Sequence, residues 1–145
     1  MKLTVKTKYG LSVLIQLCSD DSQTPVTGKA IAQLQNISES YVEQIMIPLT
    51  ASGIIRTLRG SKGGYILNRE SKEIFLLDII EAYEGKIDFT KSDETGRKNY
   101  SMEPCKGLKV WKLFEKSIQK LASEINMELI MEKFLNNSKE GEYII

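Results

Sequence analysis

The chain has 145 residues, of which 41% are hydrophobic and 27% charged, and its formal net charge at pH 7 is only +1. It contains no histidine and two cysteines, Cys18 and Cys105, which excludes histidine-based catalytic or metal sites and a disulfide framework. No apolar run approaches the ~20 residues of a membrane-spanning helix, and the N-terminus lacks a secretory signal, so we expect a cytoplasmic protein that is not an enzyme and has no membrane partner.

Basic and acidic residues are segregated along the chain despite the small net charge. Residues 1–19 and 53–69 together contain seven lysines or arginines and no acidic residue, whereas residues 70–94 contain eight acidic residues and three lysines. This pattern is typical of a basic face that binds a polyanion, although chance clustering on solvated loops would give the same counts.

Residues 10–35 predict a helix, a loop and a second, short helix. The first helix has one buried face with apolar residues at i, i+3, i+4 and i+7, namely Leu11, Leu14, Ile15 and Cys18. On this face Cys18 is expected to be a core residue rather than a reactive thiol. Thr27 is an N-cap candidate for the second helix, "GKAIAQLQ", whose Ile31 and Leu34 should point inward.

A further helix follows closely and completes a helix-turn-helix unit. Ser38 is its N-cap candidate, Pro48 is expected to bend or end it, and Gly53 is a candidate C-cap. Its inward stripe consists of Val42, Ile45, Met46 and Leu49. Its outward residues are Ser40, Glu43, Gln44 and Ile47.

The stretch "RGSKGGY", residues 59–65, lies between two strand-like runs, "IIRTL" and "YILNR", which predicts a β-hairpin. Its three glycines are expected to supply positive φ for a tight or bulged turn, with Arg59 and Lys62 at the exposed tip. A phosphate-binding loop is disfavoured, because Lys62 is followed by glycine and a strand rather than by Ser or Thr and a helix. Helix, helix-turn-helix and hairpin, in this order, predict a mainly α, winged helix-turn-helix fold with a two-stranded wing.

The rest of the chain predicts three more helices and a loop. "FLLDIIEAYEG" is a short helix with one apolar side formed by Leu77, Ile80 and Tyr83. Residues 86–105 have little periodicity and are expected to form a flexible loop. A long helix starts near Lys106 and a short one near Asn126, followed by a frayed tail. The long helix carries a heptad-like seam of Trp111, Phe114, Ile118, Leu121 and Ile125.

The outward residues of the helix-turn-helix and the hairpin tip carry groups that suit DNA. Gln44 can bond an adenine edge, Glu43 can accept from a cytosine amino group, and Tyr41 can reach a phosphate. Arg59 fits the negative potential of a narrow minor groove. Each residue also has a purely structural alternative role. Glu43 could compensate the positive end of the helix dipole, and the charges of the hairpin could serve solubility alone.

Residues 37–67, "ISESYVEQIMIPLTASGIIRTLRGSKGGYIL", closely resemble the signature of the Rrf-two (Rrf2) family of winged-helix transcription regulators, which includes IscR-like and CymR-like members. The N-terminal helix, "LLDIIEAYEG" and the Trp111 helix fit as well. The resemblance implies a DNA-binding domain over residues 1–85, a sensor region over 86–105, and a dimerisation helix with a short C-terminal helix over 106–145. The implied DNA contacts are Ser38, Ser40, Tyr41, Glu43, Gln44, Arg59, Gly60 and Lys62.

The predicted function is therefore that of a homodimeric, sequence-specific DNA-binding regulator, expected to be a repressor acting on a pseudo-palindromic operator in double-stranded DNA. The seam from Trp111 to Ile125 becomes the dimer interface. The alternative is a winged helix that serves as a protein-interaction module without specific DNA binding. A small molecule or a partner protein is the expected effector, and the CymR-like branch responds to a partner protein.

This chain has fewer cysteines than the members of the family that bind an iron–sulfur cluster. Iron–sulfur members carry three clustered cysteines between the short and the long helix, whereas residues 86–108 contain Cys105 alone and Cys18 lies far away along the chain. A cluster normally takes about four ligands, mostly thiolates, so no iron–sulfur cluster and no other cofactor or metal are expected. Cys105, beside Lys106, is a candidate redox-sensing thiol, and a cysteine without any role is the alternative.

Overall fold

The computed structural model describes residues 2–19, 23–90 and 106–140. In chain order these residues form α1 (Val5–Ser19), α2 (Gly28–Gln35), α3 (Glu39–Ala51), β1 (Ile55–Leu58), β2 (Gly64–Leu67), the 3-10 helix η1 (Ser71–Glu73), α4 (Leu76–Glu84), α5 (Leu108–Glu124) and α6 (Met127–Glu140). None of the described helices combines the length and the apolar character needed to cross a membrane.

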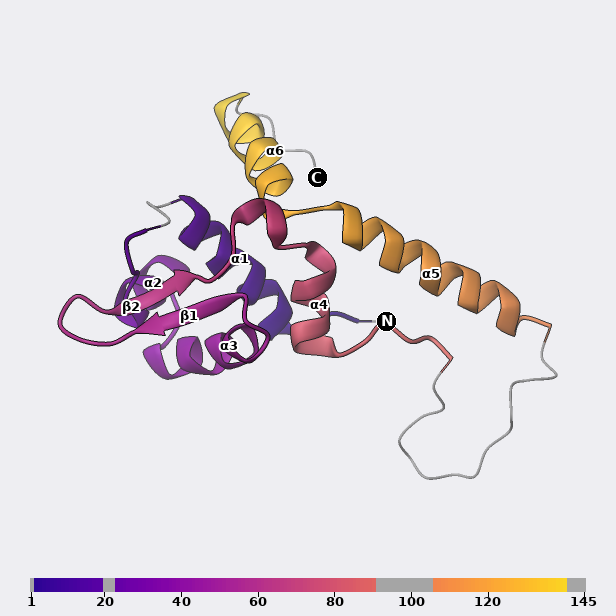
Figure 1. Cartoon of the computed structure of the whole chain (residues 1–145), viewed down its shortest axis with the longest axis horizontal. Coiled ribbons are helices and arrows are strands. Elements are labelled where there is room, and N and C mark those ends of the chain that lie inside the picture. The colour runs from indigo at the N-terminus through magenta and orange to yellow at the C-terminus, as the bar shows by residue number, and fades with distance from the viewer. Residues whose placement is uncertain (1, 20–22, 91–105, 141–145) are drawn as a thin grey trace.

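The first four α-helices and the hairpin form a winged helix, which confirms the predicted mainly α fold class. α2 and α3 are the two helices of the helix-turn-helix, α1 and α4 pack against α3, and the β1–β2 hairpin extends beyond them as the wing (Figure 1). α5 runs away from this body on the side opposite to the wing, and α6 returns to pack against α1 and η1.

One apolar core holds the winged helix together. Residues without any exposed surface come from most of its elements and also from α6; they include Val13, Leu14, Ile31, Val42, Ile45, Leu49, Ile54, Ile74 and Met127. The inward stripe predicted for α3 is therefore confirmed. Such complete burial is the main source of stability, at about 1.5–3 kcal/mol for each large aliphatic side chain.

The buried face of α1 differs from the predicted one. Its deepest residues are Gly10, Val13, Leu14 and Leu17, whereas Leu11, Ile15 and Cys18 pack at the edge of the core with partial exposure. The reason is that α1 is covered from several sides, by α3, α4, α6, α2 and β2, so its apolar stripe is wider than one face. Cys18 nevertheless lies in an apolar environment, as expected.

Both predicted N-caps are confirmed. The Ala30 N–H donates to Thr27 Oγ1 and the Tyr41 N–H donates to Ser38 Oγ, each at 3.1 Å. The inward position predicted for Leu34 is wrong, because this side chain is 68% exposed. α2 turns Ile31 and the small Ala32 toward the core, and that orientation carries Leu34 out to solvent.

The C-terminal end of α3 is set by Gly53 rather than by Pro48. Gly53 has φ +74°, and the N–H groups of Gly53 and Ile54 donate to the carbonyls of Thr50 and Leu49, each at 3.0 Å. These two bonds form a Schellman motif. Pro48 lies inside α3 without ending it, because the Gln44 carbonyl that it leaves unpaired belongs to an exposed residue that water can reach.

The predicted hairpin is confirmed and gains a third partner. β1 and β2 pair antiparallel from Ile55↔Leu67 to Leu58↔Gly64. Val26 lies beside β2 and exchanges two main-chain hydrogen bonds with Tyr65, at 2.9 and 2.8 Å. The wing is thereby fastened to the segment that leads into α2.

The three glycines of the wing turn are required for different reasons. Gly64 has φ +153°, as predicted, and a Cβ on it would lie 2.5 Å from the carbonyl oxygen of Val26. Gly60 has φ +111° in open space, so its role is conformational, as expected. Gly63 does not have positive φ, contrary to the prediction; a Cβ on Gly63 would instead lie 2.2 Å from the carbonyl oxygen of Leu58. The turn is closed by a 3.0 Å bond from the Gly63 N–H to the Gly60 carbonyl.

α4 turns two adjacent isoleucines inward rather than the predicted side alone. Ile79 is buried in the main core, Ile80 is buried against α5, and Leu77 and Tyr83 are partly exposed. This arrangement follows from the position of α4 between α3 and α5. α4 ends at Gly85, which has φ +77°.

The joint between α5 and α6 is tied to the start of α4. The Leu76 N–H donates to the Ile125 carbonyl at 2.7 Å, and the Met127 N–H donates to the Ile74 carbonyl at 2.8 Å. Asn126 Oδ1 accepts from the Leu129 N–H at 2.8 Å and so caps α6. α6 continues to Glu140, so the helix runs well into the tail that was expected to fray.

Candidate nucleic-acid interface

The outward face of α3 presents most of the predicted contact residues to solvent. Ser40, Glu43 and Gln44 are exposed, on the side opposite to the buried stripe. Ser38 and Tyr41 stand at the start of the same helix. α3 is thus a rigid, core-anchored helix with a polar face, which is what a recognition helix requires.

Ser38 and Tyr41 also have structural roles. Ser38 Oγ accepts the N-capping bond from Tyr41 and lies 3.3 Å from Ser40 Oγ. The Tyr41 ring is half-buried and meets Tyr9 of α1 edge to face, with ring centroids 5.8 Å apart. These two residues therefore fix the start of α3, and only part of each side chain remains accessible to a partner.

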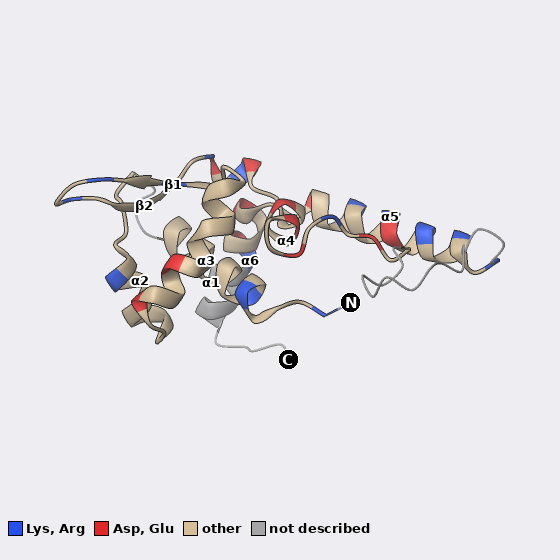
Figure 2. Cartoon of the chain, turned by 90° about the horizontal axis from the view of Figure 1, so that it is seen from below, with Lys and Arg blue, Asp and Glu red and all other residues tan. Residues whose placement is uncertain are grey.

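The wing tip presents two cations away from the body. Arg59, Gly60 and Lys62 are all exposed, and Figure 2 shows the basic segments of the wing projecting beyond the helices. Among the described residues, the ion pairs are Arg69–Asp78 and Lys72–Glu70, so neither Arg59 nor Lys62 is neutralised by a neighbour there. Both charges are available for an anionic partner.

Arg69, by contrast, does not belong to a free basic face. Its Nη2 donates to the Ser52 carbonyl at 2.8 Å, and its Nη1 lies 3.6 Å from Asp78 Oδ2. Asn68 supports the same turn by donating to the Gly53 carbonyl at 3.0 Å. Arg69 therefore links the end of α3, the wing and α4, and the basic segment 53–69 contributes fewer free charges than the sequence suggests.

A buried link between α4 and α3 was not anticipated from the sequence. The Tyr83 hydroxyl donates to the main-chain carbonyl of Ile45, in the middle of α3, at 2.7 Å. Burial raises the pKa of Tyr83 above its ordinary value, and the nearby Tyr41 adds to this. The ring crosses α1 over Gly10, where a Cβ would lie 2.4 Å from it. A glycine inside a helix was the signal that could have indicated this close approach.

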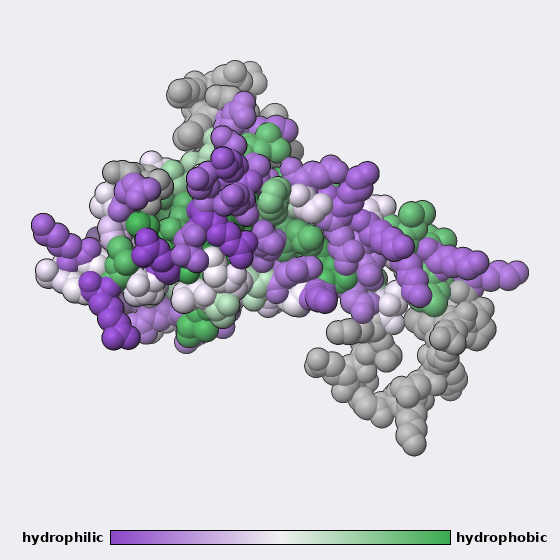
Figure 3. All heavy atoms as spheres, in the orientation of Figure 1, coloured by the Kyte–Doolittle hydropathy of each residue, from purple (hydrophilic) through white to green (hydrophobic). Residues whose placement is uncertain are grey.

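The seam predicted along α5 splits into two sets. Ile118 faces α4 and packs with Ile80 and Ala122, and Ile125 ends the helix in an extended conformation. Five further apolar side chains of α5 are 47–66% exposed, namely Val110, Trp111, Leu113, Phe114 and Leu121. Figure 3 shows hydrophobic atoms on the surface of the outer part of α5. We call these five residues the α5 apolar face.

Residues 86–90 lie along α5. Ile87 is buried, its carbonyl accepts from Gln119 Nε2 at 3.0 Å, and the Phe89 N–H donates to Glu115 Oε2 at 3.0 Å. Phe89 also stacks obliquely on Phe114, with centroids 5.3 Å apart. The rest of the expected flexible loop, with Cys105, lies outside the described residues.

The described residues offer little to a metal ion. They contain no group of three or more His, Cys, Asp or Glu side chains placed to hold one. Burial raises the pKa of Cys18 to about 11, so its thiol stays protonated near neutral pH. Cys18 therefore has the character of a core residue, consistent with its place at the edge of the core.

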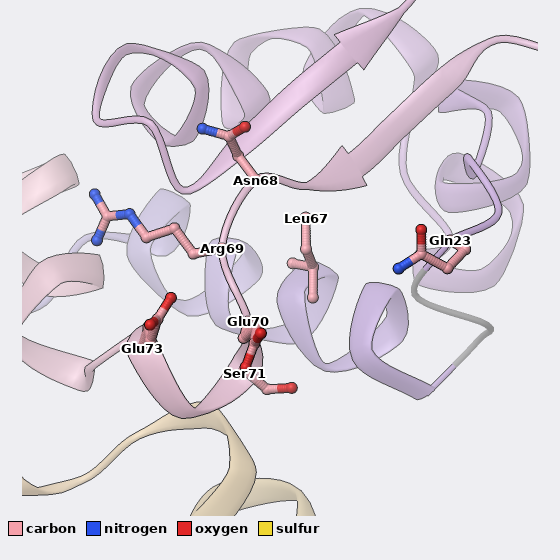
Figure 4. A pocket seen from close by; sticks show the side chains of 7 residues that line it. All are labelled: Gln23, Leu67, Asn68, Arg69, Glu70, Ser71 and Glu73. Carbon is pink, nitrogen blue, oxygen red and sulfur yellow. The ribbon is translucent and has the colours of Figure 1, made fainter.

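A hollow also lies behind the wing. It measures about 480 Å³ and is lined by Gln23, Leu67, Asn68, Arg69, Glu70, Ser71 and Glu73 (Figure 4). Arg69 points from it toward α4, and Glu70 pairs with Lys72 at 3.0 Å. Since Arg69 and Glu70 already have partners in the chain, α3 and the wing tip remain the better candidates for ligand contact.

Comparison with known proteins shows the family to which the chain belongs. The Rrf2 family model, described as an iron-dependent transcriptional regulator, matches residues 3–133. The regulator CymR of Bacillus subtilis is 41% identical over 87 residues, which cover 60% of this chain and 63% of that protein. The regulator slr0846 of Synechocystis, whose assignment is itself provisional, is 32% identical over 99% of this chain and 97% of its own length.

Solved structures show the same architecture. The structure of CymR, the global cysteine regulator of B. subtilis, superposes with a TM-score of 0.73 at 29% identity, covering 92% of this chain and 98% of that one. IscR of T. potens superposes with a TM-score of 0.69 at 30% identity, covering 100% and 93%. The chain therefore belongs to the Rrf2 family, whose members are transcription regulators rather than enzymes, and is a winged-helix DNA-binding regulator.

Proposed function

We propose that the chain is a repressor that binds a pseudo-palindromic operator as a homodimer, with α3 in the major groove and the wing tip in the adjacent minor groove. The observation that carries this proposal is the pairing of an exposed polar α3 face with an unneutralised cationic wing tip on one rigid body. Helix and wing together suit a duplex, because one supplies base contacts and the other phosphate or minor-groove contacts.

The α5 apolar face supports the homodimer. Five large apolar side chains gathered on one exposed helix are more than a monomeric surface usually leaves in water. A second copy would cover them, and the two-fold axis would present two recognition helices to half-sites about one helical turn apart, or a multiple of it. A dimer on such an operator represses by occluding the promoter.

We further propose that regulation does not use an iron–sulfur cluster. The whole sequence has two cysteines and no histidine, and Cys18 is a protonated core thiol. This donor set does not fit the iron dependence in the family description. A small molecule, a partner protein or oxidation of Cys105 would then carry the signal. Anaerobic reconstitution with iron and sulfide should leave iron at background levels, and one cluster per protomer would contradict the proposal.

Selection of bound duplexes from a random pool tests the DNA-binding proposal. We expect a two-fold symmetric consensus, and binding that weakens steeply with salt because each phosphate contact releases counterions. Repeating the selection with a thiol oxidant would report whether Cys105 matters. A protein that enriches no sequence, yet captures a protein partner, would indicate an interaction module instead.

Arg59→Ala tests the wing. Loss of one cation from each of the two wings should lower the affinity of the dimer at least about ten-fold and reduce the salt slope by about 0.9 per wing, or about 1.8 for the dimer. Lys133→Ala is the matched control, because it removes one exposed cation from α6, which packs against α1 and η1. Equal affinities for both variants and the unchanged protein would show that the wing tip does not touch DNA.

A further inference from the structure

A groove separates the outward face of α3 from the wing. It has a volume of about 410 Å³, and its lining residues are Glu43, Met46, Ile47, Thr50, Thr57 and Tyr65. Thr57 and Tyr65 face each other across the hairpin as a cross-strand pair. One wall is therefore the recognition helix, and the other is the wing.

Ile47 is the conspicuous residue of this groove. It is 65% exposed, whereas Ile45 and Met46 beside it on α3 are buried. It lies one helical turn beyond Glu43, on the same side of the helix. A large aliphatic group is thus held next to the side chain that is expected to read a base, on a helix too well anchored to turn it inward.

Tyr65 gives the groove a fixed wall. Its main-chain N–H and C=O both bond to Val26, and it lies opposite Thr57 in the register of the hairpin. Its ring packs over Gly28, where a Cβ would sit 3.7 Å from Cε2. Tyr65 and Glu43 both line the groove, and burial together with the Glu43 carboxylate raises the pKa of Tyr65, so its phenol stays neutral. The groove is therefore a preformed slot and not a gap between mobile side chains.

The charge around the groove indicates what fills it. The wing that forms one wall carries the exposed cations Arg59 and Lys62, the neighbouring α2 carries the exposed Lys29, and Glu43 lines the groove itself. Figure 2 shows that the basic segments of the wing and α2 lie at the same end of the molecule, away from α5. A ligand that fills the groove must carry negative charges at its edges, facing the cations, and an apolar group between them, facing Ile47. The major groove of DNA does so only at thymine, through the C5-methyl group between two phosphate strands.

We infer that Ile47 is a specificity residue that contacts the methyl group of one operator thymine in each half-site, next to the base read by Glu43. This inference rests on the proposed DNA-binding function. Glu43 can accept from the amino group of an adjoining cytosine, and Ile47 covers the thymine methyl beside it. The two side chains, one turn apart on α3, would then read two neighbouring base pairs.

Replacement of single thymines by deoxyuridine in the selected operator tests the inference, because it removes only the methyl group. For the unchanged protein we expect one thymine per half-site at which the replacement weakens binding about four-fold, the value of one buried methyl group. With Ile47→Ala, thymine and deoxyuridine at that position should bind equally. Ile47→Val, which keeps a branched but shorter side chain, should retain part of the discrimination.

Leu34→Ala is the matched control, because Leu34 is an equally exposed aliphatic residue on α2 that does not line the groove. It should keep the full preference for thymine, and unfolding midpoints should be similar for all variants. Discrimination that persists in Ile47→Ala, or that appears at no thymine, would overturn the inference while leaving DNA binding intact. Failure of the unchanged protein to select any duplex would instead overturn the proposed function, and the inference with it.

Discussion

The winged helix buries its apolar side chains, whereas most of those on α5 are exposed to solvent. In the winged helix, residues such as Leu14, Ile45 and Leu49 have no exposed surface, whereas in the 17 residues of α5 only Ala122 is buried. The winged helix therefore contains its own source of stability. α5 buries little apolar surface against the winged helix, so its apolar face needs a second surface to cover it.

α5 is nevertheless held in a defined direction. Glu115 and Gln119 bond to the main chain of residues 86–90, and the end of α5 is tied to Leu76 through the Ile125 carbonyl. These bonds turn Ile118 and Ala122 toward α4 and leave the α5 apolar face outward. The difference between the two regions thus separates the part that makes the fold from the part that presents an exposed apolar face.

The largest effect should come from the core of the winged helix. Leu14→Ala removes a fully buried side chain and leaves a cavity, so we expect the free energy of unfolding to fall by about 2–5 kcal/mol in urea titrations. Leu34→Ala is the control at an exposed site and should change it by less than about 0.5 kcal/mol. Similar losses for both would mean that α1 is not part of the core.

The next effect should appear in assembly rather than in folding. Leu121→Asp places a charge in the α5 apolar face and should raise the dimer dissociation constant at least ~30-fold, about 2 kcal/mol, in sedimentation equilibrium. Ser123→Asp is the matched control, two residues further along and exposed on another side of the same helix. Unchanged association of Leu121→Asp would remove α5 from the dimer interface.

Local patterns in the sequence predicted most of the winged helix. Thr27, Ser38 and Gly53 were identified as caps because capping depends on residue type and near neighbours alone. The stripe of α3 followed from its periodicity. Pro48 does not end α3, because the cost of an internal proline depends on whether water can reach the carbonyl that it leaves unpaired, which a sequence does not reveal.

Features that depend on packing between distant segments were missed. Tyr83 reaches Ile45 only because α4 crosses α1 at Gly10, and Tyr65 lines the groove only because Val26 joins the sheet. The heptad-like seam of α5 was read as one surface, yet Ile118 belongs to the contact with α4. Periodicity shows that a helix has an apolar side but does not say how many partners share that side.

The hydrogen bond of Tyr83 offers a smaller test within the winged helix. Tyr83→Phe deletes its donor to the Ile45 carbonyl and should cost about 1 kcal/mol of unfolding free energy. Because folding raises the pKa of Tyr83, the neutral phenol stabilises the fold below the ordinary tyrosine pKa of about 10, and this contribution is lost as pH rises above it. The difference between the wild-type protein and Tyr83→Phe should therefore narrow in alkaline urea titrations, and a constant difference would mean that the hydroxyl is not buried.

The smallest effect should come from Glu84, which joins α4 to the start of α1. Its Oε1 accepts from the Thr7 hydroxyl and, at 2.8 Å each, from the Thr4 N–H and hydroxyl. These bonds, that of Thr7 first, lower the pKa of Glu84, although partial burial opposes them. The stabilisation is therefore present above the ordinary glutamate pKa of about 4.3 and disappears as pH falls below it. Because solvent screens this exposed group, Glu84→Gln should show only a small loss of thermal stability near pH 7. That loss should vanish in acid, where Glu84 itself becomes protonated. Glu81→Gln removes a carboxylate from the same helix without these three bonds and should not reproduce that pH dependence; if it did, the effect would stem from the net charge of α4 and not from its link to α1.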